Sequence, residues 1–288
     1  MTLRREYAWW IFVVLALTGC AADRDADTAT AHVSSSPTPV APSAPPLGSR
    51  AAPTTAGASA IAGAPEAPSP TRPPVLVNRT TTFGHSARGR PLMVTEIGNP
   101  ASAHRVLIVG SIHGNELAGD QIATALKAAI PRPDADLWIV QELNPDGAAA
   151  ATRRNADGVD LNRNFPFQWR PLGSRGSYDY SGTRALSEPE SAAAALLITR
   201  IHPTLAIWFH QHLAVVDDSQ GPINIERRFS ALVGLPLARL TDYPGSVTGW
   251  QDAMFGPTAF VVELPAGQLA PGSAQRYVDA IETVETIN

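Results

Sequence analysis

The composition of the chain changes abruptly near Val75, and this change limits the possible folds more than any other feature of the sequence. Residues 21–74 are rich in Ala, Pro, Ser and Thr and nearly free of aromatic residues. Such a segment cannot bury enough apolar surface to offset its chain entropy, so we predict a disordered tether. From Val75 onward, short apolar runs alternate with longer helical patterns, which predicts a single α/β domain over residues 75–288.

The order of these patterns indicates which elements the domain contains. Ser187 followed three positions later by Glu190 is typical of a capping box at the start of a helix. We expect buried strands at residues 106–112, 137–143, 205–209 and 259–262, and helices at residues 117–130, 187–201, 227–240 and 273–287.

The N-terminal residues are typical of an export signal. Arg4 and Arg5 precede an apolar run from Ala8 to Leu17, which is too short for the roughly 20 residues that span a bilayer. Leu17-Thr18-Gly19-Cys20 resembles the bacterial lipoprotein box, which implies cleavage before Cys20 and acylation of its thiol. An ordinary cleaved signal with an unrelated cysteine is the alternative interpretation.

A lipidated Cys20 implies an envelope protein. Residues 1–19 would be the lipoprotein signal peptide, and residues 20–74 would be the acylated cysteine followed by the linker. Several acyl chains on one residue anchor a protein firmly, because each buried methylene contributes about 0.8 kcal/mol. Ala21 and Ala22 follow the cysteine in place of Asp, which by resemblance to sorting rules in two-membrane bacteria favours the outer membrane, facing the periplasm.

Charge and cysteine content exclude several function classes. The formal net charge is -4 and the sequence pI is about 6.0, so no broad basic surface is expected for nucleic acid. Cys20 is the only cysteine, so the folded part contains neither an internal disulfide nor a thiolate metal site. A metal in the domain must therefore use His, Asp or Glu.

Two histidines and a glutamate follow predicted strands. His113 and Glu116 come directly after the first strand, where Gly114 permits a tight turn, and His210 follows the strand of residues 205–209. Ligands gather beyond the carboxyl ends of strands in open α/β sheets, and catalytic zinc takes three His or carboxylate ligands. The three residues thus form a candidate zinc site, with His212 as a pocket residue, a structural residue or the alternative ligand.

Glu263 follows the apolar strand of residues 259–262. A carboxylate in this position is costly if it is buried without a partner, which favours a functional reason for it. Near a metal-bound water it would act as general acid and base, whereas a structural ion pair is the alternative.

The segment from Arg153 to Pro166 gathers Arg, Asn and Asp with little apolar content, so it is not expected in the core. One arginine can stabilise the oxyanion that develops when water attacks an amide, and another can grip a carboxylate with two hydrogen bonds. Together these properties suit cleavage beside a free carboxyl group.

Taken in order, these residues resemble the zinc metallocarboxypeptidases of the carboxypeptidase A type, over about residues 83–288. The resemblance rests on five features: His113-x-x-Glu116, Asn144-Pro145-Asp146-Gly147, Gly158-Val159-Asp160-Leu161-Asn162-Arg163-Asn164-Phe165-Pro166, the strand-end His210, and Glu263.

The resemblance implies a three-layer α/β/α fold with a mixed, mostly parallel eight-stranded sheet. It also implies one zinc ion on His113, Glu116 and His210, with Glu263 as the general base. Asp160 matches the carboxylate that orients the first zinc histidine, an arrangement that metal sites commonly use.

The same resemblance implies roles in binding substrate. Arg153 would stabilise the oxyanion, with Arg154 as the alternative, and Asn162 with Arg163 would clamp the terminal carboxylate of the substrate. Tyr243 is the candidate for the tyrosine that caps the substrate. The side-chain pocket should be shaped near three uncharged residues, Val247, Thr248 and Gly249, which indicates no preference for basic side chains.

Within the family the short domain looks most like the bacterial murein-peptide amidases, which cut between γ-D-glutamate and diaminopimelate. Two alternatives stay open at this point. One is a deacylase of small N-acyl amino acids, similar to succinylglutamate desuccinylase and aspartoacylase. The other is a non-catalytic lipoprotein that binds the cell wall and keeps the fold.

Overall fold

The computed structural model describes residues 73–219, 222–241, 243–256 and 259–287. The expected signal peptide, Cys20 and almost all of the tether lie outside these residues. The chain divides into two units, and the second, Pro68–Asn288, contains everything described below. Within the described residues, no helix has the length and apolar character that a membrane span requires.

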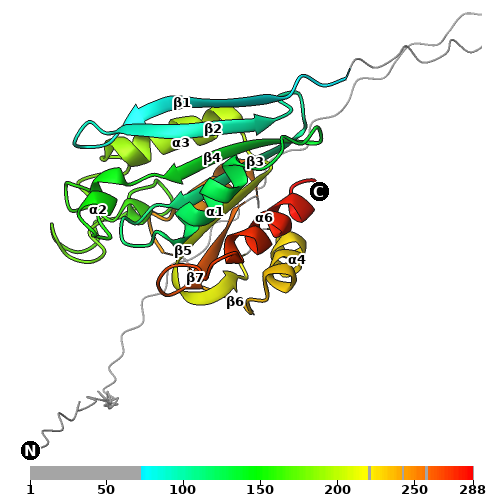
Figure 1. Ribbon diagram of the computed structural model, residues 1–288. Coiled ribbons are helices and arrows are strands. Elements are labelled where there is room, and N and C mark those ends of the chain that lie inside the picture. The colour runs from blue at the N-terminus through cyan, green and yellow to red at the C-terminus, as the bar shows by residue number, and fades with distance from the viewer. Residues whose placement is uncertain (1–72, 220–221, 242, 257–258, 288) are drawn as a thin grey trace, which may run out of the picture. The chain divides into compact units, whose positions relative to one another are not determined.

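A single mixed sheet forms the centre of the domain (Figure 1). Its strands lie in the order β1-β2-β4-β3-β5-β6, and β7 also pairs with β5. The β1–β2 and β2–β4 pairs are antiparallel, whereas the other pairs are assigned as parallel, which confirms a mixed, mostly parallel sheet. The strands are β1 (Val77–His85), β2 (Pro91–Gly98), β3 (His104–Ser111), β4 (Ala135–Glu142), β5 (Leu205–Asp217), β6 (Leu237–Ala238) and β7 (Ala259–Pro265).

Helices cover both faces of the sheet, because the central strands are apolar on both faces. In β3, Val106 and Ile108 belong to one core cluster, while Leu107 and Val109 belong to the other. Figure 1 shows α1 and α6 in front of the sheet and α3 behind it, which confirms three layers. The first cluster includes α1 (Ala118–Lys127), α4 (Ile223–Val233) and α6 (Ser273–Val284), the second includes α3 (Pro189–Ile201) and α5 (Val247–Phe255), and the short helices are α2 (Pro145–Ala149) and η1 (Leu161–Arg163).

Strand β5 reverses its course beside β7. From Ala206 to His212, residues of β5 pair with successively later residues of β7, up to Pro265. Leu213 also lies opposite Pro265, and the residues after it pair with successively earlier residues of β7. Glu263 therefore lies opposite both His210 and Val215. Because a strand has two edges, the two parts of β5 lie on either side of β7. Seven strands are assigned in the sheet. If the two parts of β5 are counted separately, the sheet has the eight strand positions that the resemblance implies.

The predicted helix at residues 227–240 is wrong in its extent. Helix α4 begins at Ile223 and ends at Val233, where Gly234 adopts the left-handed conformation (φ 71°) that ends many helices. The residues that follow form the short strand β6, which pairs with the end of β5. Sheet pairing therefore overrides the helical pattern.

The predicted capping box at Ser187 is also wrong. Helix α3 begins at Pro189, Glu188 occupies the N-cap position, and no side chain caps the helix. The Ser187 hydroxyl instead donates to Glu188 Oε1 (2.6 Å) and accepts from Asn164 Nδ2 (2.9 Å). The hydroxyl is thus part of the network that holds the loop of residues 153–166.

Glu226 on α4 makes stability depend on pH. It is fully buried, and burial raises its pKa from 4.5 to about 8, helped by Asp217 and opposed by a hydrogen bond from Ser219. An acid with a raised folded-state pKa contributes fully to stability below the unfolded value, near 4.5, and this contribution is lost as pH rises through 8. We therefore expect the free energy of unfolding to fall less between these pH values in Glu226→Gln than in the wild type, measured by urea denaturation. Asp157→Asn, which changes an exposed carboxyl group in another part of the domain, is the control and should follow the wild type.

Candidate metal centre and catalytic site

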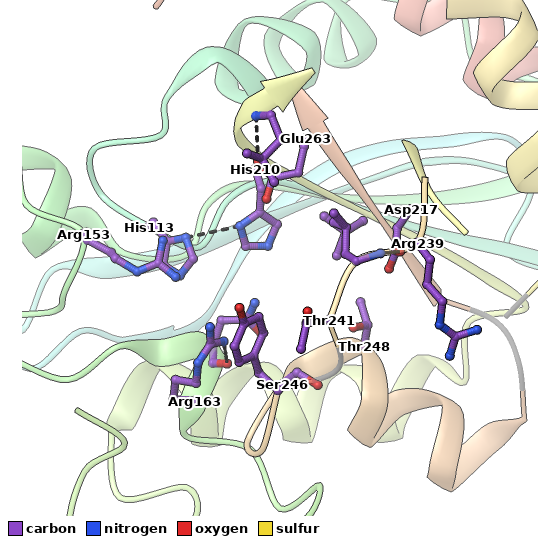
Figure 2. A pocket seen from close by; sticks show the side chains of 15 residues that line it. His113, Arg153, Arg163, His210, Asp217, Arg239, Thr241, Ser246, Thr248 and Glu263 are labelled. Carbon is purple, nitrogen blue, oxygen red and sulfur yellow. Dashed lines mark hydrogen bonds between the residues drawn. The ribbon is translucent and has the colours of Figure 1, made fainter. Parts of the chain in front are cut away.

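His113, Glu116 and His210 converge on one point (Figure 2). His113 Nδ1 lies 2.8 Å from Glu116 Oε2, and His210 Nδ1 lies 3.1 Å from the same oxygen. The two Nδ1 atoms are 3.2 Å apart. All three residues are buried. His113 and Glu116 follow β3, whereas His210 lies within β5, 97 residues from His113 along the chain.

This donor set fits zinc. Ligands on a tetrahedral zinc ion lie about 2.1 Å from the metal, and thus roughly 3.4 Å from one another, close to the separations found here. His113 Nε2 lies 3.0 Å from Asp160 Oδ1. This partner places the ring proton on Nε2 and leaves the Nδ1 lone pair facing Glu116, so a cation between these acceptors completes the arrangement.

Both carboxylates of the centre are held in the ionised form. When the histidines carry protons in place of a metal ion, burial opposes ionisation of Glu116, but hydrogen bonds and charge interactions with His113 and His210 hold its pKa well below the usual range. Burial likewise opposes ionisation of Asp160, and the interactions with His113 and Arg153 again lower its pKa. Both carboxylates are therefore ionised, and a divalent cation would take the place of the histidine protons as the positive charge beside them.

Two short motifs pack together to shape the loop that carries His113. A Cβ atom at Gly114 would lie 2.0 Å from the carbonyl carbon of Gly147, so the two loops approach as only glycine permits. Asn144 accepts a hydrogen bond from Gly147 N (2.9 Å) and donates one to the Arg153 carbonyl (3.1 Å). The His113–Glu116 loop, α2 and the segment at Arg153 are thereby fixed to one another.

Arg153, and not Arg154, faces the metal centre. Its Nη1 lies 2.7 Å from Glu116 Oε1, and its Nε lies 3.0 Å from Asp160 Oδ2. Its guanidinium also lies over the ring of Tyr178, 4.7 Å from the centroid. Arg154 instead donates to the carbonyl of Gly176 at the protein surface. The geometry therefore favours Arg153 for the oxyanion role.

Asn162 and Arg163 lie in the same pocket as the histidines. Asn162 Oδ1 accepts a hydrogen bond from Val247 N (2.9 Å) at the start of α5, which fixes the orientation of the amide. Arg163 is buried, and its guanidinium lies 4.1 Å from the centre of the Tyr243 ring. Tyr243 is half-exposed and also lines the pocket, a position compatible with the predicted cap.

Asn164, in the motif of residues 158–166, is a positioning residue. The sequence alone indicated no role for it. It is fully buried, and its Nδ2 donates to the carbonyls of Ser181 (2.8 Å) and Arg184 (3.0 Å). Its Oδ1 accepts from Glu188 N (3.2 Å) and from the Ser191 hydroxyl. Asn164 thus ties the Asn162–Arg163 segment to the start of α3.

Glu263 lies beside the triad because β7 pairs with β5. It is opposite His210 in the sheet register, and Figure 2 shows it next to that histidine. Its Oε2 accepts a long hydrogen bond from Leu213 N (3.4 Å). The carboxylate is only partly buried and faces a pocket of about 270 Å³, so it can exchange a proton with a water molecule there.

Some residues expected in the pocket are elsewhere. His212 is exposed, belongs to neither the triad nor the pocket, and lies at the irregularity where β5 reverses. Thr248 lines the pocket, whereas Val247 is buried in the core and Gly249 packs against Phe167. Two charged pocket residues, Asp217 and Arg239, were missed, because only the reversal of β5 and its pairing with β6 bring them here.

Asp160→Asn should weaken zinc binding by about 10–100-fold, the usual effect of losing a partner that orients a metal ligand. The substitution removes the negative charge of Asp160. This charge favours a proton on His113 Nε2 and forms an ion pair with Arg153. Asp157→Asn, an exposed change in the same loop, is the matched control and should keep the wild-type affinity. Competition with a chelator of known affinity measures both, and equal affinity in the two variants would contradict the role of Asp160.

The class of protein follows from comparison with known families. Residues 71–216 match the zinc carboxypeptidase family, described as peptidase M14. The chain belongs to this family, and it is therefore a hydrolase of peptide bonds from a zinc-dependent family, with the His-Glu-His triad in place.

Particular relatives narrow the comparison. Over 185 residues the chain is 32% identical to murein peptide amidase A of Escherichia coli (strain K12), covering 59% of this chain and 75% of the relative. The protein of the same name from Vibrio campbellii is 31% identical over 198 residues, covering 64% of this chain and 79% of the relative. The crystal structure of murein-tripeptide amidase MpaA from Escherichia coli O157 superposes with a TM-score of 0.59 at 26% identity, covering 73% of this chain and 92% of that one.

Proposed function

We propose that the protein binds one zinc ion and hydrolyses murein peptides at the amide bond between γ-D-glutamate and diaminopimelate. The observation that carries the proposal is the convergence of His113, Glu116 and His210, with both histidines lining the same pocket as Arg163. The named relatives are murein peptide amidases, which supports the choice of substrate.

The side chains divide the reaction between them. Asn162 and Arg163 bind the free carboxylate of the substrate, which places the scissile carbonyl beside Arg153. Zinc in the triad supplies Lewis-acid catalysis. Glu263 takes a proton from the attacking water while the water oxygen bonds to the carbonyl carbon, and it gives that proton to the departing amine nitrogen as the C–N bond breaks. Arg153 stabilises the negative charge that develops on the carbonyl oxygen.

The test is an assay of the full-length protein with the tripeptide L-Ala-γ-D-Glu-meso-diaminopimelate. We expect release of free diaminopimelate, detected by mass spectrometry, and loss of this activity when the metal is removed with a chelator. Hydrolysis of N-succinyl or N-acetyl amino acids without cleavage of the tripeptide would contradict the proposal in favour of a deacylase.

We also propose that an acylated Cys20 anchors the protein in the cell envelope, with the outer membrane as its location. The support is the sequence Leu17-Thr18-Gly19-Cys20, together with the proposed substrate, a peptide of the cell wall. The wild type is expected in the membrane fraction and Cys20→Ser in the soluble fraction. A variant that still sediments with the outer membrane would contradict the lipid anchor.

A further inference from the structure

The pocket carries a pair of opposite charges at the end away from Arg153. Asp217 and Arg239 line the same pocket as His113 and Glu263, and Figure 2 shows them on the far side of His210. The guanidinium of Arg239 is exposed and turned away from the histidines, whereas Asp217 is buried, at 8% exposure. The deeper charge is thus negative, and the charge at the rim is positive.

The fold holds these two residues together. Asp217 is the last residue of β5 and lies opposite Ala238 of β6, the residue before Arg239. Asp217 Oδ1 also accepts a hydrogen bond from Leu240 N (2.8 Å). A carboxylate has about four acceptor positions, so the bond from Leu240 N and the other contacts of Asp217 do not exclude a further donor.

Uncharged residues line the pocket beside the charged pair. Leu240, Thr248 and Val261 also line the pocket and carry no charge. These uncharged lining residues can contact the methylene chain of a substrate side chain. The charged pair can bind charged groups at the end of that chain.

We propose that Asp217 and Arg239 select a substrate side chain that ends in both an ammonium and a carboxylate group. Asp217 accepts the hydrogen bonds of the ammonium, and Arg239 binds the carboxylate at the rim. The inference rests on the proposed function, because the distal end of diaminopimelate is such a group. A lysine side chain satisfies only Asp217, and an uncharged norleucine side chain satisfies neither residue.

The experiment compares three substrates, L-Ala-γ-D-Glu-X with X as meso-diaminopimelate, L-lysine or L-norleucine, using the zinc-loaded full-length protein. The wild type should cleave them in that order of kcat/KM. Arg239→Gln should lower kcat/KM about 10-fold for diaminopimelate and leave lysine unchanged, as expected when one charge-assisted bond is lost. Asp217→Asn should lower kcat/KM about 10-fold for diaminopimelate and for lysine, but not for norleucine.

Matched controls separate charge from structure. Asn at position 217 keeps an acceptor for Leu240 N, and Asp218→Asn and Arg228→Gln remove one charge of each sign that does not line the pocket. Both controls should keep the wild-type order. A wild type that cleaves all three substrates equally, or variants that lower all three equally, would overturn this inference and leave the proposed function standing. Failure of the wild type to cleave any of the three would overturn both.

Discussion

Glu263→Gln is expected to lower kcat by about 10²–10⁴-fold while the protein keeps its zinc, because the variant loses a general base but no metal ligand. Glutamine has the shape of glutamate and keeps an acceptor for Leu213 N, so the end of β7 should not move. The measurements are steady-state kinetics on the murein tripeptide and the zinc content of the purified protein.

The outcomes for Glu263 are distinct. Full activity in the variant would contradict its role as the base. Loss of zinc together with activity would show instead that Glu263 supports the metal centre. Glu282→Gln, a change on α6 outside the pocket, is the matched control and should retain wild-type kcat.

His210→Ala is expected to remove both zinc and activity. Only His113 and Glu116 would remain as ligands, and catalytic zinc sites use three protein ligands. The loss of affinity should exceed the roughly 100-fold effect of removing a residue that only orients a ligand. Zinc content after dialysis, together with turnover of the tripeptide, measures this effect.

His212→Ala is the matched control for His210, because it removes an imidazole two residues further along the same strand. His212 is exposed and lies outside the triad, so this variant should keep its zinc and its activity. If His212→Ala lost zinc and His210→Ala kept it, the third zinc ligand would be His212 and not His210.

The metal triad was predictable from sequence because it depends on strand ends. The parallel pairing of β3 and β5 ends with Val109 opposite Trp208, so the residues just beyond this pairing lie close together, although His210 is still within β5. Strand β7 is the next neighbour of β5, which brings Glu263 to His210. An apolar run followed by polar residues is visible in the sequence itself, so these positions could be predicted without knowledge of the sheet order.

Other features depend on contacts between distant segments and were not predictable in the same way. The apolar run at residues 213–216 does not indicate that β5 turns back beside β7, and without this reversal Asp217 and Arg239 could not be placed in the pocket. The hairpin of β1 and β2 was also missed, because most of β1 is exposed at the sheet edge and contains no apolar run. Ser187 failed as a helix cap because Asn164, 23 residues away, engages its hydroxyl.

A crystal structure of the zinc-loaded protein, with anomalous diffraction recorded on both sides of the zinc absorption edge, tests the metal centre directly. One strong peak is expected about 2.0–2.2 Å from His113 Nδ1, Glu116 Oε2 and His210 Nδ1. A peak bound elsewhere in the domain, or no peak between these atoms in a protein that is active and contains zinc, would contradict the metal centre described here.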